Sequence, residues 1–361
     1  MIVYIIIFAM SMGLANMVKR IPGVRLWIKA LISSMPVVLL TGLRYDVGTD
    51  FFSYEMGYYG LRHDYDEIIF LKLSDFLANI SNYNYQVFIF VTSFLFVYIL
   101  YLAIWHLSDN VEISILMFML STFYFGGMNA IRQGIAVSIC LYAIRYIVAN
   151  DEEKLLELNT KKAKREKRNN ILKFIICVVI AMMIHDTTII CLGYLVLDRI
   201  KFNNIKPLIA VALAFAFSNK IRDLLFLIIK NTSVKHYGSV INPGSSDVAE
   251  TYILMVIGTF LVVSYIKWYY ETDRTFNLFF NMLLVAMILG IFTTWMPYGK
   301  RVMWNYLFVI IFLIPKAVGY LKIKTNRQVM YSLFVVYFFA LAYQSIVLSR
   351  THGCIPYQWC L

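Results

Sequence analysis

Apolar segments of about 20 residues recur along the whole chain, and each is long enough to cross a hydrocarbon core of about 30 Å as an α-helix. Of the 361 residues, 60% are hydrophobic and 15% are charged, whereas a soluble domain carries about 25% charged residues. Backbone groups in lipid must bond to one another, so segments of this kind are helical. The sequence therefore predicts an all-α, polytopic transmembrane helical bundle that forms a single integral membrane domain over residues 1–361.

The apolar pattern predicts about 12 spans, of which the sixth and seventh are short enough to be two half-helices or one long tilted span. Met1 to Met17 has no basic segment in front of its apolar run, so we expect a retained first helix and not a cleaved signal peptide. The predicted spans are 1–18, 26–43, 86–106, 111–127, 129–149, 171–185, 187–199, 206–221, 249–269, 275–296, 302–321 and 328–348.

Most of the lysines and arginines fall on one side of this layout. The strongest marker is KKAKREKR at 161–168, within a basic loop at 150–170 that we expect to be cytoplasmic. Counting spans outward from this loop places both termini outside. Loops of this kind meet anionic headgroups of the lipid bilayer, which accounts for the net charge of +12 without nucleic acid as a partner.

The polar residues that loop solvation explains least well lie on the predicted outer face. Charged side chains at a membrane edge are expensive to place and usually belong to a site. The segment GLRYDVGTDFFSY at 42–54 contains several of them directly after a predicted span. We therefore expect a site that faces outward. Its candidates are Arg44, Asp46, Asp50, Arg62, His63, Asp64, Asp66, Asn129, Arg132, Gln133, His185, Asp186, Lys300 and Arg301.

Two outer loops have distinct compositions. In the loop 44–85, the stretches FFSYEMGYYG and DEIIFLKLSDFLANI have apolar residues at helical spacing, with tyrosine and phenylalanine suited to headgroup depth. This pattern predicts helices that lie in the interfacial plane. The loop 230–248 is polar and rich in glycine and serine, which predicts a mobile flap or lid.

Each candidate side chain also has a plainer explanation. Arg44 could form only an interfacial ion pair with Asp46. Arg132 could extend to the outer headgroups, and His185 could be a structural histidine. The remaining basic groups could be solvated loop residues or, in 161–168, an orientation signal alone. These are Arg62 with His63, Lys300 with Arg301, and the cluster KKAKREKR.

Arginines from separate spans, one histidine and a few aspartates suggest recognition of an anion. One guanidinium can bind two phosphate oxygens at once. A diphosphate carried on a lipid could therefore lie at the outer membrane edge, among these arginines. The sequence has no P-loop, no Gly-x-Ser-x-Gly elbow and no DxD with a metal-binding surround. The five cysteines lack the spacing of a metal site, although a Cys354–Cys360 disulfide is compatible with an outside tail.

On its motifs, the chain resembles the EpsG family of polytopic membrane proteins, which belong with the Wzy-type polysaccharide polymerases. The motifs follow one another in the same order over nearly the whole chain. They are Arg44-Tyr45-Asp46-Val47-Gly48-Thr49-Asp50 with Tyr54, Asn129-Ala130-Ile131-Arg132-Gln133, His185 with Thr187 and Thr188, Gly299-Lys300-Arg301, and Ile355-Pro356-Tyr357.

The resemblance implies a GT-C-like, metal-independent glycosyltransferase of the bacterial cytoplasmic (inner) membrane, with its active site on the outer, periplasmic side and no cofactor. It would move a glycan from undecaprenyl diphosphate to a sugar hydroxyl of another lipid-linked repeat unit, in exopolysaccharide, capsule or O-antigen synthesis. A flippase and a chain-length regulator are the further partners that it implies.

The same resemblance gives the candidate residues their roles. His185 would be the base that accepts the hydroxyl proton, because an imidazole titrates near neutral pH, with Asp46 or Asp50 as the second choice. The diphosphate would be bound by Arg132 and Arg301, with Arg44 either assisting or locking the loop, and further by Lys300, Asn129 and Gln133.

Three other classes remain open from the sequence. A flippase or transporter of lipid-linked oligosaccharide should place polar residues in the middle of its spans, whereas this chain keeps them at one face. A multi-pass O-acyltransferase should show a path to a cytosolic acyl donor. An O-antigen ligase uses the same donor with a different acceptor, and the sequence does not separate it from a polymerase.

Overall fold

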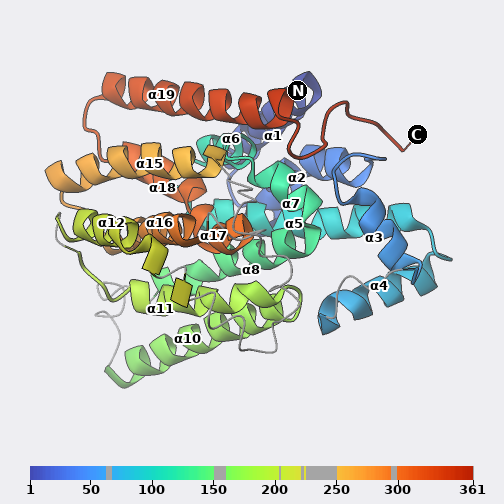
Figure 1. Ribbon diagram of the computed structural model, residues 1–361, viewed down its shortest axis with the longest axis horizontal. Helices are drawn as coiled ribbons and strands as arrows, with labels where there is room; N and C mark the ends of the chain where they lie inside the picture. Colours follow the sequence, from blue (N-terminus) through green and yellow to red (C-terminus); the bar gives the residue numbers. More distant parts are fainter. Residues whose placement is uncertain are drawn as a thin grey trace. The chain divides into compact units, whose positions relative to one another are not determined.

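The computed structural model describes residues 1–61, 67–149, 160–202, 205–220, 223–224, 250–293 and 299–360. Within these residues every regular element is a helix, and the one β feature is an isolated bridge between Arg44 and Trp359 (Figure 1). The all-α prediction is confirmed. The chain packs as two compact units, one formed by Met1–Leu192 with Leu321–Leu361 and the other by Gly193–Tyr320.

The first unit is built around one helix that is apolar on all sides. The central helix α5 packs against α2 and α8, while α1 packs on α2 and α10 packs on α8; Figure 1 shows α2, α5, α8 and α10 in that order. A helix that is hydrophobic all round belongs in a core, and Phe88, Phe96 and Leu100 of α5 are fully buried. The elements of this unit are α1 (Ile2–Lys19), α2 (Leu26–Gly42), α3 (Phe51–Tyr58), α4 (Ile68–Ile80), α5 (Tyr85–Leu107), α6 (Val111–Leu120), α7 (Phe123–Asn129), α8 (Ile131–Val148), α10 (Thr160–Met182), the 3₁₀ helix η1 (Asp186–Gly193, whose last residue begins the second unit), α19 (Lys324–Tyr343) and the π-helix η2 (Gln344–Leu348).

The second unit is arranged around α16, which packs against each of the other helices of that unit. The Asn281 amide of α16 donates to the carbonyls of Leu197 and Ile200 at 2.9 and 2.8 Å, and so caps the end of α11. Arg274 forms an ion pair with Asp198 beside this cap. The elements are α11 (Tyr194–Leu197), α12 (Lys206–Ala216), α15 (Glu250–Tyr269), α16 (Arg274–Thr293), α17 (Gly299–Leu307) and α18 (Ile310–Gly319).

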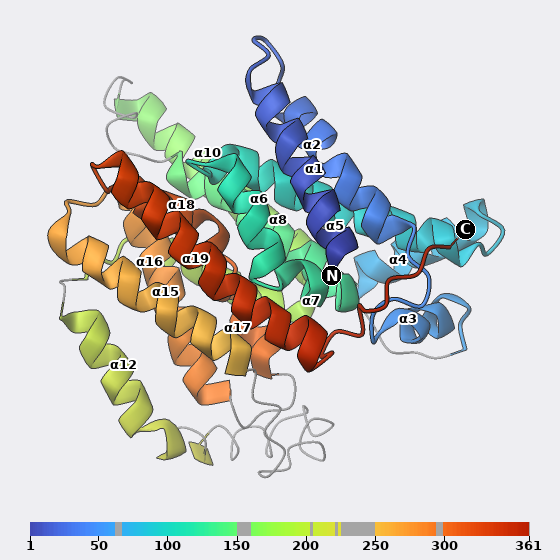
Figure 2. The same ribbon diagram turned by 90° about the horizontal axis from the view of Figure 1, so that it is seen from above.

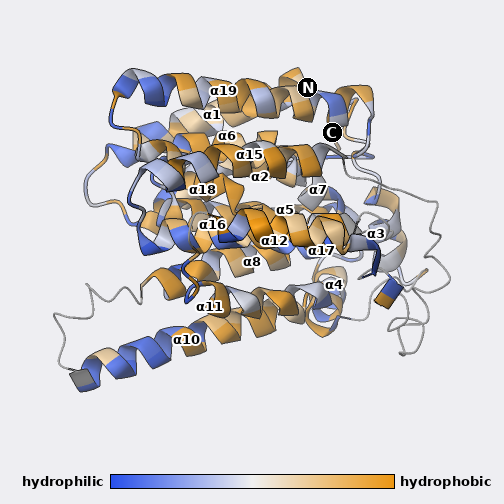
Figure 3. Cartoon of the chain, turned by 60° about the vertical axis from the view of Figure 1, so that its left-hand side comes forward, coloured by the Kyte–Doolittle hydropathy of each residue, from blue (hydrophilic) through white to orange (hydrophobic). Residues whose placement is uncertain are grey.

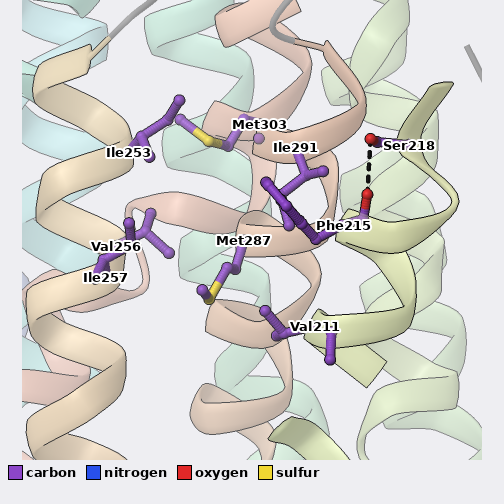
Figure 4. A pocket seen from close by; sticks show the side chains of 11 residues that line it. Val211, Phe215, Ser218, Ile253, Val256, Ile257, Met287, Ile291 and Met303 are labelled. Carbon is purple, nitrogen blue, oxygen red and sulfur yellow. Dashed lines mark hydrogen bonds between the residues drawn. The ribbon is translucent and has the colours of Figure 1, made fainter. Parts of the chain in front are cut away.

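A cavity of about 470 Å³ lies within the second unit among α12, α15, α16 and α17 (Figure 4). Its lining is apolar, and the one hydroxyl among the lining residues, that of Ser218, donates to the Phe215 carbonyl at 2.8 Å. No titratable side chain lines this cavity, so its walls offer shape to an apolar group and no acid–base chemistry.

Seven helices of the described chain are long and apolar enough to cross a membrane, and an eighth crossing results if the bent pair α6 and α7 forms one span. Figure 3 shows long hydrophobic stretches along the helices. Several of their apolar residues are exposed, including Ile6 and Met10 of α1 and Val336 of α19. Such surfaces are suited to lipid. The chain is therefore a polytopic membrane protein. The seven are Ile2–Lys19, Tyr85–Leu107, Ile131–Val148, Thr251–Tyr269, Arg274–Phe292, Arg301–Gly319 and Lys324–Leu348.

The predicted number of spans, about 12, is not confirmed, and the reasons are local. The helix in the predicted span 26–43 has 17 residues, and η1 and α11 in 187–199 are short. Helix α10 begins at Thr160, so the basic cluster 161–168 is helical and continuous with the apolar half of α10. The outer loop does contain two helices, α3 and α4, and their position in the interfacial plane stays a prediction. The flap at 230–248 lies outside the described residues.

Candidate functional site

One end of the first unit brings together segments that are far apart in the sequence. Figure 2 shows the N-terminus, the C-terminal tail, α3 and α4 at this end. The Tyr4 hydroxyl donates to the Cys354 carbonyl at 2.8 Å, and the Asn129 amide donates to the His352 carbonyl at 2.8 Å. These contacts place the start of α1 and the junction of α7 and α8 beside the tail.

The junction of α7 and α8 is a tight reversal made possible by glycine. Helices α6 and α7 meet at 57°, with Thr122 between them in a left-handed conformation at φ 60°. A Cβ on Gly134 would lie 2.8 Å from the Gly127 carbonyl oxygen, and a Cβ on Gly127 would lie 2.3 Å from the Phe96 ring. Only glycine allows this close approach. The reversal places Asn129 on one side of the apex, and Arg132 opens α8 on the other.

A single carboxylate, that of Glu67, connects Arg132 with His185. Glu67 Oε2 accepts a hydrogen bond from Arg132 Nη1 at 2.5 Å, and Glu67 Oε1 lies 3.4 Å from His185 Nδ1. The three side chains are 15%, 17% and 13% exposed, in the order Glu67, Arg132 and His185. On the far side of the imidazole, Nε2 is buried and has no hydrogen-bond partner among the described residues.

The helix ends explain why these residues meet. Glu67 immediately precedes α4, and the Ile69 amide donates to the Met183 carbonyl at 3.1 Å, which fixes the start of α4 to the end of α10. His185 follows that end, and its carbonyl accepts from Thr188 Oγ1 at 2.7 Å. Unsatisfied carbonyls at a helix end need such partners, so this backbone capping holds His185 in place.

Aromatic side chains enclose the arginine of this cluster. Arg132 interacts with the Tyr54 hydroxyl of α3, and its guanidinium lies 5.9 Å from the centre of the Phe70 ring. Tyr54 and Phe70 are buried and meet edge to face at 6.1 Å. The guanidinium is thus held by α3 and α4 as well as by Glu67.

The Glu67 carboxyl is stabilised in its ionised form. Burial raises its pKa, but the hydrogen bond with His185 and the positive charge of Arg132 outweigh burial, so the net pKa of Glu67 is lowered. An ionised Glu67 carboxylate 3.4 Å from His185 Nδ1 favours the tautomer that carries its proton on Nδ1, which leaves Nε2 with its lone pair when the imidazole is neutral. The arrangement is that of a base whose orientation is fixed by a carboxylate.

A metal ion could also find ligands here, because one atom each of Glu67, His185 and Asp186 lies within 4.8 Å of the others. Arg132 competes with a cation for the same carboxylate, and its charge opposes a second positive charge beside it. We therefore assign no metal to these residues, and metal independence stays a prediction.

Arg44, predicted to bind diphosphate, lies beneath the C-terminal tail. It is 1% exposed, and its Nε and Nη1 atoms have no hydrogen-bond partner among the described residues. Tyr4, Tyr85, Tyr124 and Cys354 surround its charge. The described contacts therefore place Arg44 in a closed aromatic cage and not on an open surface.

The tail covers Arg44 through backbone hydrogen bonds. The Tyr45 amide donates to the Gln358 carbonyl at 3.1 Å, and the Cys360 amide donates to the Leu43 carbonyl at 2.9 Å. Cys354 and Cys360 are free thiols, so the disulfide left open by the sequence is not formed.

The ion pair between Arg44 and Asp46 that the sequence left open is not formed. Asp46 has a left-handed backbone at φ 49° and an exposed side chain, while Arg44 points inward. Asp50 is half-buried at the start of α3 and accepts from Thr49 Oγ1 at 3.1 Å. Both aspartates belong to the turn between α2 and α3, and their role as the second choice for the base stays a prediction.

The predicted amides are buried. Asn129 is 7% exposed, and a Cβ on Gly48, where φ is 106°, would lie 2.3 Å from its Oδ1 atom. Gln133 is 1% exposed on the first turn of α8. Asn129 therefore lies between the turn at Gly48 and the C-terminal tail and contributes to the packing of both.

The remaining predicted residues lie in the second unit or outside the described side chains. Arg301 lies in α17 of the second unit, where its carbonyl accepts from Asn305 Nδ2 at 3.4 Å. Its participation beside Arg132 stays a prediction. Outside the described side chains lie Lys300, Arg62, His63, Asp64 and Asp66.

Sequence reasoning missed Glu67, although it is the residue that joins the two best candidates. Its partners are distant in the sequence, 65 residues away for Arg132 and 118 for His185. The local pattern shows one acidic residue before an amphipathic helix, and no local signal distinguishes it from its acidic neighbours in DYDE at 64–67.

The fold and the site define a polytopic helical membrane protein with an Arg–Glu–His cluster at one end of its first unit. The chain belongs to the EpsG family, whose model matches residues 27–158 and 162–359. The family association is with membrane polysaccharide biosynthesis and with Wzy-type polymerases. The comparisons with curated proteins and with solved structures give no match. The matched ranges include Glu67, Arg132, His185 and Arg301.

Proposed function

We propose that the protein is a polysaccharide polymerase, a metal-independent glycosyltransferase of the bacterial cytoplasmic membrane that acts on its outer face. The donor is a glycan on undecaprenyl diphosphate, and the acceptor is a sugar hydroxyl of another lipid-linked repeat unit. The observation that carries the proposal is the histidine of the Arg–Glu–His cluster: His185 Nδ1 faces a carboxylate, and within the described part of the chain Nε2 has no hydrogen-bond partner. Membership of the EpsG family supports the same reaction class.

In the proposed reaction, His185 Nε2 removes the proton of the acceptor hydroxyl as the oxygen bonds to the anomeric carbon of the donor. The bond from that carbon to the diphosphate oxygen breaks, and its electron pair leaves with the diphosphate. Diphosphate is a good leaving group, so it needs charge stabilisation more than protonation. Arg132 supplies that charge, because its guanidinium can bind phosphate oxygens in a bidentate manner.

Variants of the two proposed catalytic residues test the function in cells. In a strain that lacks the gene, His185→Ala and Arg132→Ala should each fail to restore polymer while the protein remains in the membrane, because a general base contributes about 10² to 10⁴ in rate. The measurement is the gel profile of surface glycan, with membrane immunoblots as the control. Normal polymer from both variants would contradict the assignment.

The deletion strain also separates a polymerase from an O-antigen ligase, which shares the donor. Loss of a polymerase leaves single repeat units attached to the final acceptor. Loss of a ligase leaves long chains that are not attached. We expect the first pattern.

A further inference from the structure

In the Arg–Glu–His cluster, one carboxylate contacts two side chains with different proposed tasks. Glu67 Oε2 faces Arg132, the proposed diphosphate ligand, and Glu67 Oε1 faces His185, the proposed base. Asp186 follows His185 with an exposed side chain, and Tyr54 contacts Arg132. Glu67 contacts both side chains through one carboxylate.

The two contacts differ in length. Arg132 Nη1 donates to Glu67 Oε2 at 2.5 Å, which is within hydrogen-bond distance. The contact between His185 Nδ1 and Glu67 is 3.4 Å, beyond the usual range of about 2.7 to 3.2 Å for an N–H···O bond. In this structure the carboxylate therefore lies closer to Arg132 than to His185.

A diphosphate competes with Glu67 for the same donors. Guanidinium N–H groups bind phosphate and carboxylate with the same forked geometry. If Arg132 turns to a phosphate, Glu67 loses its shorter hydrogen bond while the imidazole N–H remains within reach. A carboxylate bonded to one ring nitrogen fixes the tautomer in which the other nitrogen can accept a proton, and it stabilises the imidazolium that follows.

We propose that Glu67 is a positioning residue that couples donor binding to activation of the base: without donor it pairs with Arg132, and with diphosphate on Arg132 it pairs with His185. This inference rests on the proposed function. The acceptor proton moves to His185 Nε2, Nδ1 keeps its own proton, and Glu67 stays a carboxylate throughout. His185 returns its extra proton to water after the product leaves.

The coupling predicts opposite effects of Glu67→Gln on binding and on turnover. Binding of undecaprenyl diphosphate should become about three- to tenfold tighter, because Arg132 is no longer held by a competing carboxylate. Turnover should fall about 10²-fold or more, because a glutamine does not stabilise the imidazolium. A merely structural Glu67 would weaken both properties together.

The experiment uses the full-length protein in lipid nanodiscs. Binding is measured with undecaprenyl diphosphate as the probe, and turnover is measured as chain growth from a lipid-linked repeat unit. Asp75→Asn is the matched control, since Asp75 is an exposed carboxylate on the same helix α4, and it should change neither quantity. Glu67→Asp keeps the charge and should retain part of the turnover.

The outcomes are distinct. Tighter binding with lower turnover in Glu67→Gln supports the coupling, while loss of both or change in neither overturns it. If Glu67→Gln does not fold, the ¹⁵N NMR signals of His185 in the wild-type protein test the coupling instead. Undecaprenyl diphosphate should strengthen the hydrogen bond at Nδ1, and unchanged signals would overturn the coupling. Tighter binding by Glu67→Gln with no chain growth in the wild type supports the competition for Arg132 and overturns the polymerase.

Discussion

Arg44 is an arginine whose side chain is almost completely buried. A buried cation without a carboxylate costs several kcal/mol unless polar groups surround it, and tyrosine hydroxyls and the Cys354 thiol are the groups that surround it here. The tail that closes over it bonds to Leu43 and Tyr45 through the backbone. We interpret Arg44 as the residue that holds the C-terminal tail against the turn between α2 and α3.

This interpretation predicts that Arg44→Ala opens the tail. In the wild type, burial raises the pKa of the Cys354 thiol to about 12, so the thiol should be inert. Loss of the large side chain should lower the free energy of unfolding by about 2–4 kcal/mol and make Cys354 reactive. Alkylation of Cys354 in a Cys360→Ser background measures this. Arg25→Ala, which removes an exposed arginine, is the control, and a protected Cys354 in Arg44→Ala would contradict the interpretation.

Some residues of the candidate site can be predicted from the sequence and others cannot. Arg132 and His185 stood out because a charge or a histidine beside an apolar segment is unusual, and the structure places them at one carboxylate. Glu67 did not stand out, because its partners are brought to it only by tertiary packing. Asp46 was paired with Arg44 by proximity alone, and the left-handed backbone of the turn separates them.

At the level of elements, the reversal between α7 and α8 positions Arg132. Its geometry depends on Gly127 and Gly134, which bring two backbones within contact. The sequence predicts spans at 111–127 and 129–149, and both segments are long and apolar enough to be recognised from hydropathy. The bend between α6 and α7 cannot be recognised in this way, because it lies at Thr122, whose left-handed backbone is not visible in hydropathy.

Gly134→Ala should therefore impair both stability and activity. The added methyl would meet a backbone carbonyl oxygen at 2.8 Å, which a side-chain rotation cannot relieve. We expect a loss of about 1–3 kcal/mol in unfolding free energy and reduced polymer, because α8 carries Arg132. Gly13→Ala on α1, where nothing lies within 4 Å of the added methyl, is the matched control. Thermal unfolding in detergent compares the two, and equal stability would refute the packing argument.

At the scale of the whole molecule, hydropathy predicted the class of fold but not the number of crossings. Long apolar helices were identifiable because each satisfies its own backbone. The charged half of α10 was not identifiable as a helix, because a charged helix and a loop look alike in hydropathy. The lengths of η1 and α11 were not identifiable either, because both elements are short. Which face is outside rests on the distribution of lysine and arginine alone.

Labelling of introduced cysteines tests that orientation. In a cysteine-free background, Asp46→Cys in the turn after α2 should react with a membrane-impermeant thiol reagent added to cells whose cytoplasmic membrane is intact. Glu166→Cys in the basic half of α10 should react only after that membrane is opened, because basic segments remain cytoplasmic. Both side chains are exposed, so burial does not confound the comparison. The reverse pattern would place the candidate site on the cytoplasmic side.

The central claim is that the cluster of Glu67, Arg132 and His185 builds polymer from lipid-linked repeat units without a metal. The most direct measurement is chain growth by the purified full-length protein in liposomes that contain a lipid-linked repeat unit and EDTA, resolved on a gel. The wild type should give a ladder of increasing length, and His185→Ala should give none. No ladder from the wild type, or an unchanged ladder from His185→Ala, would contradict the account.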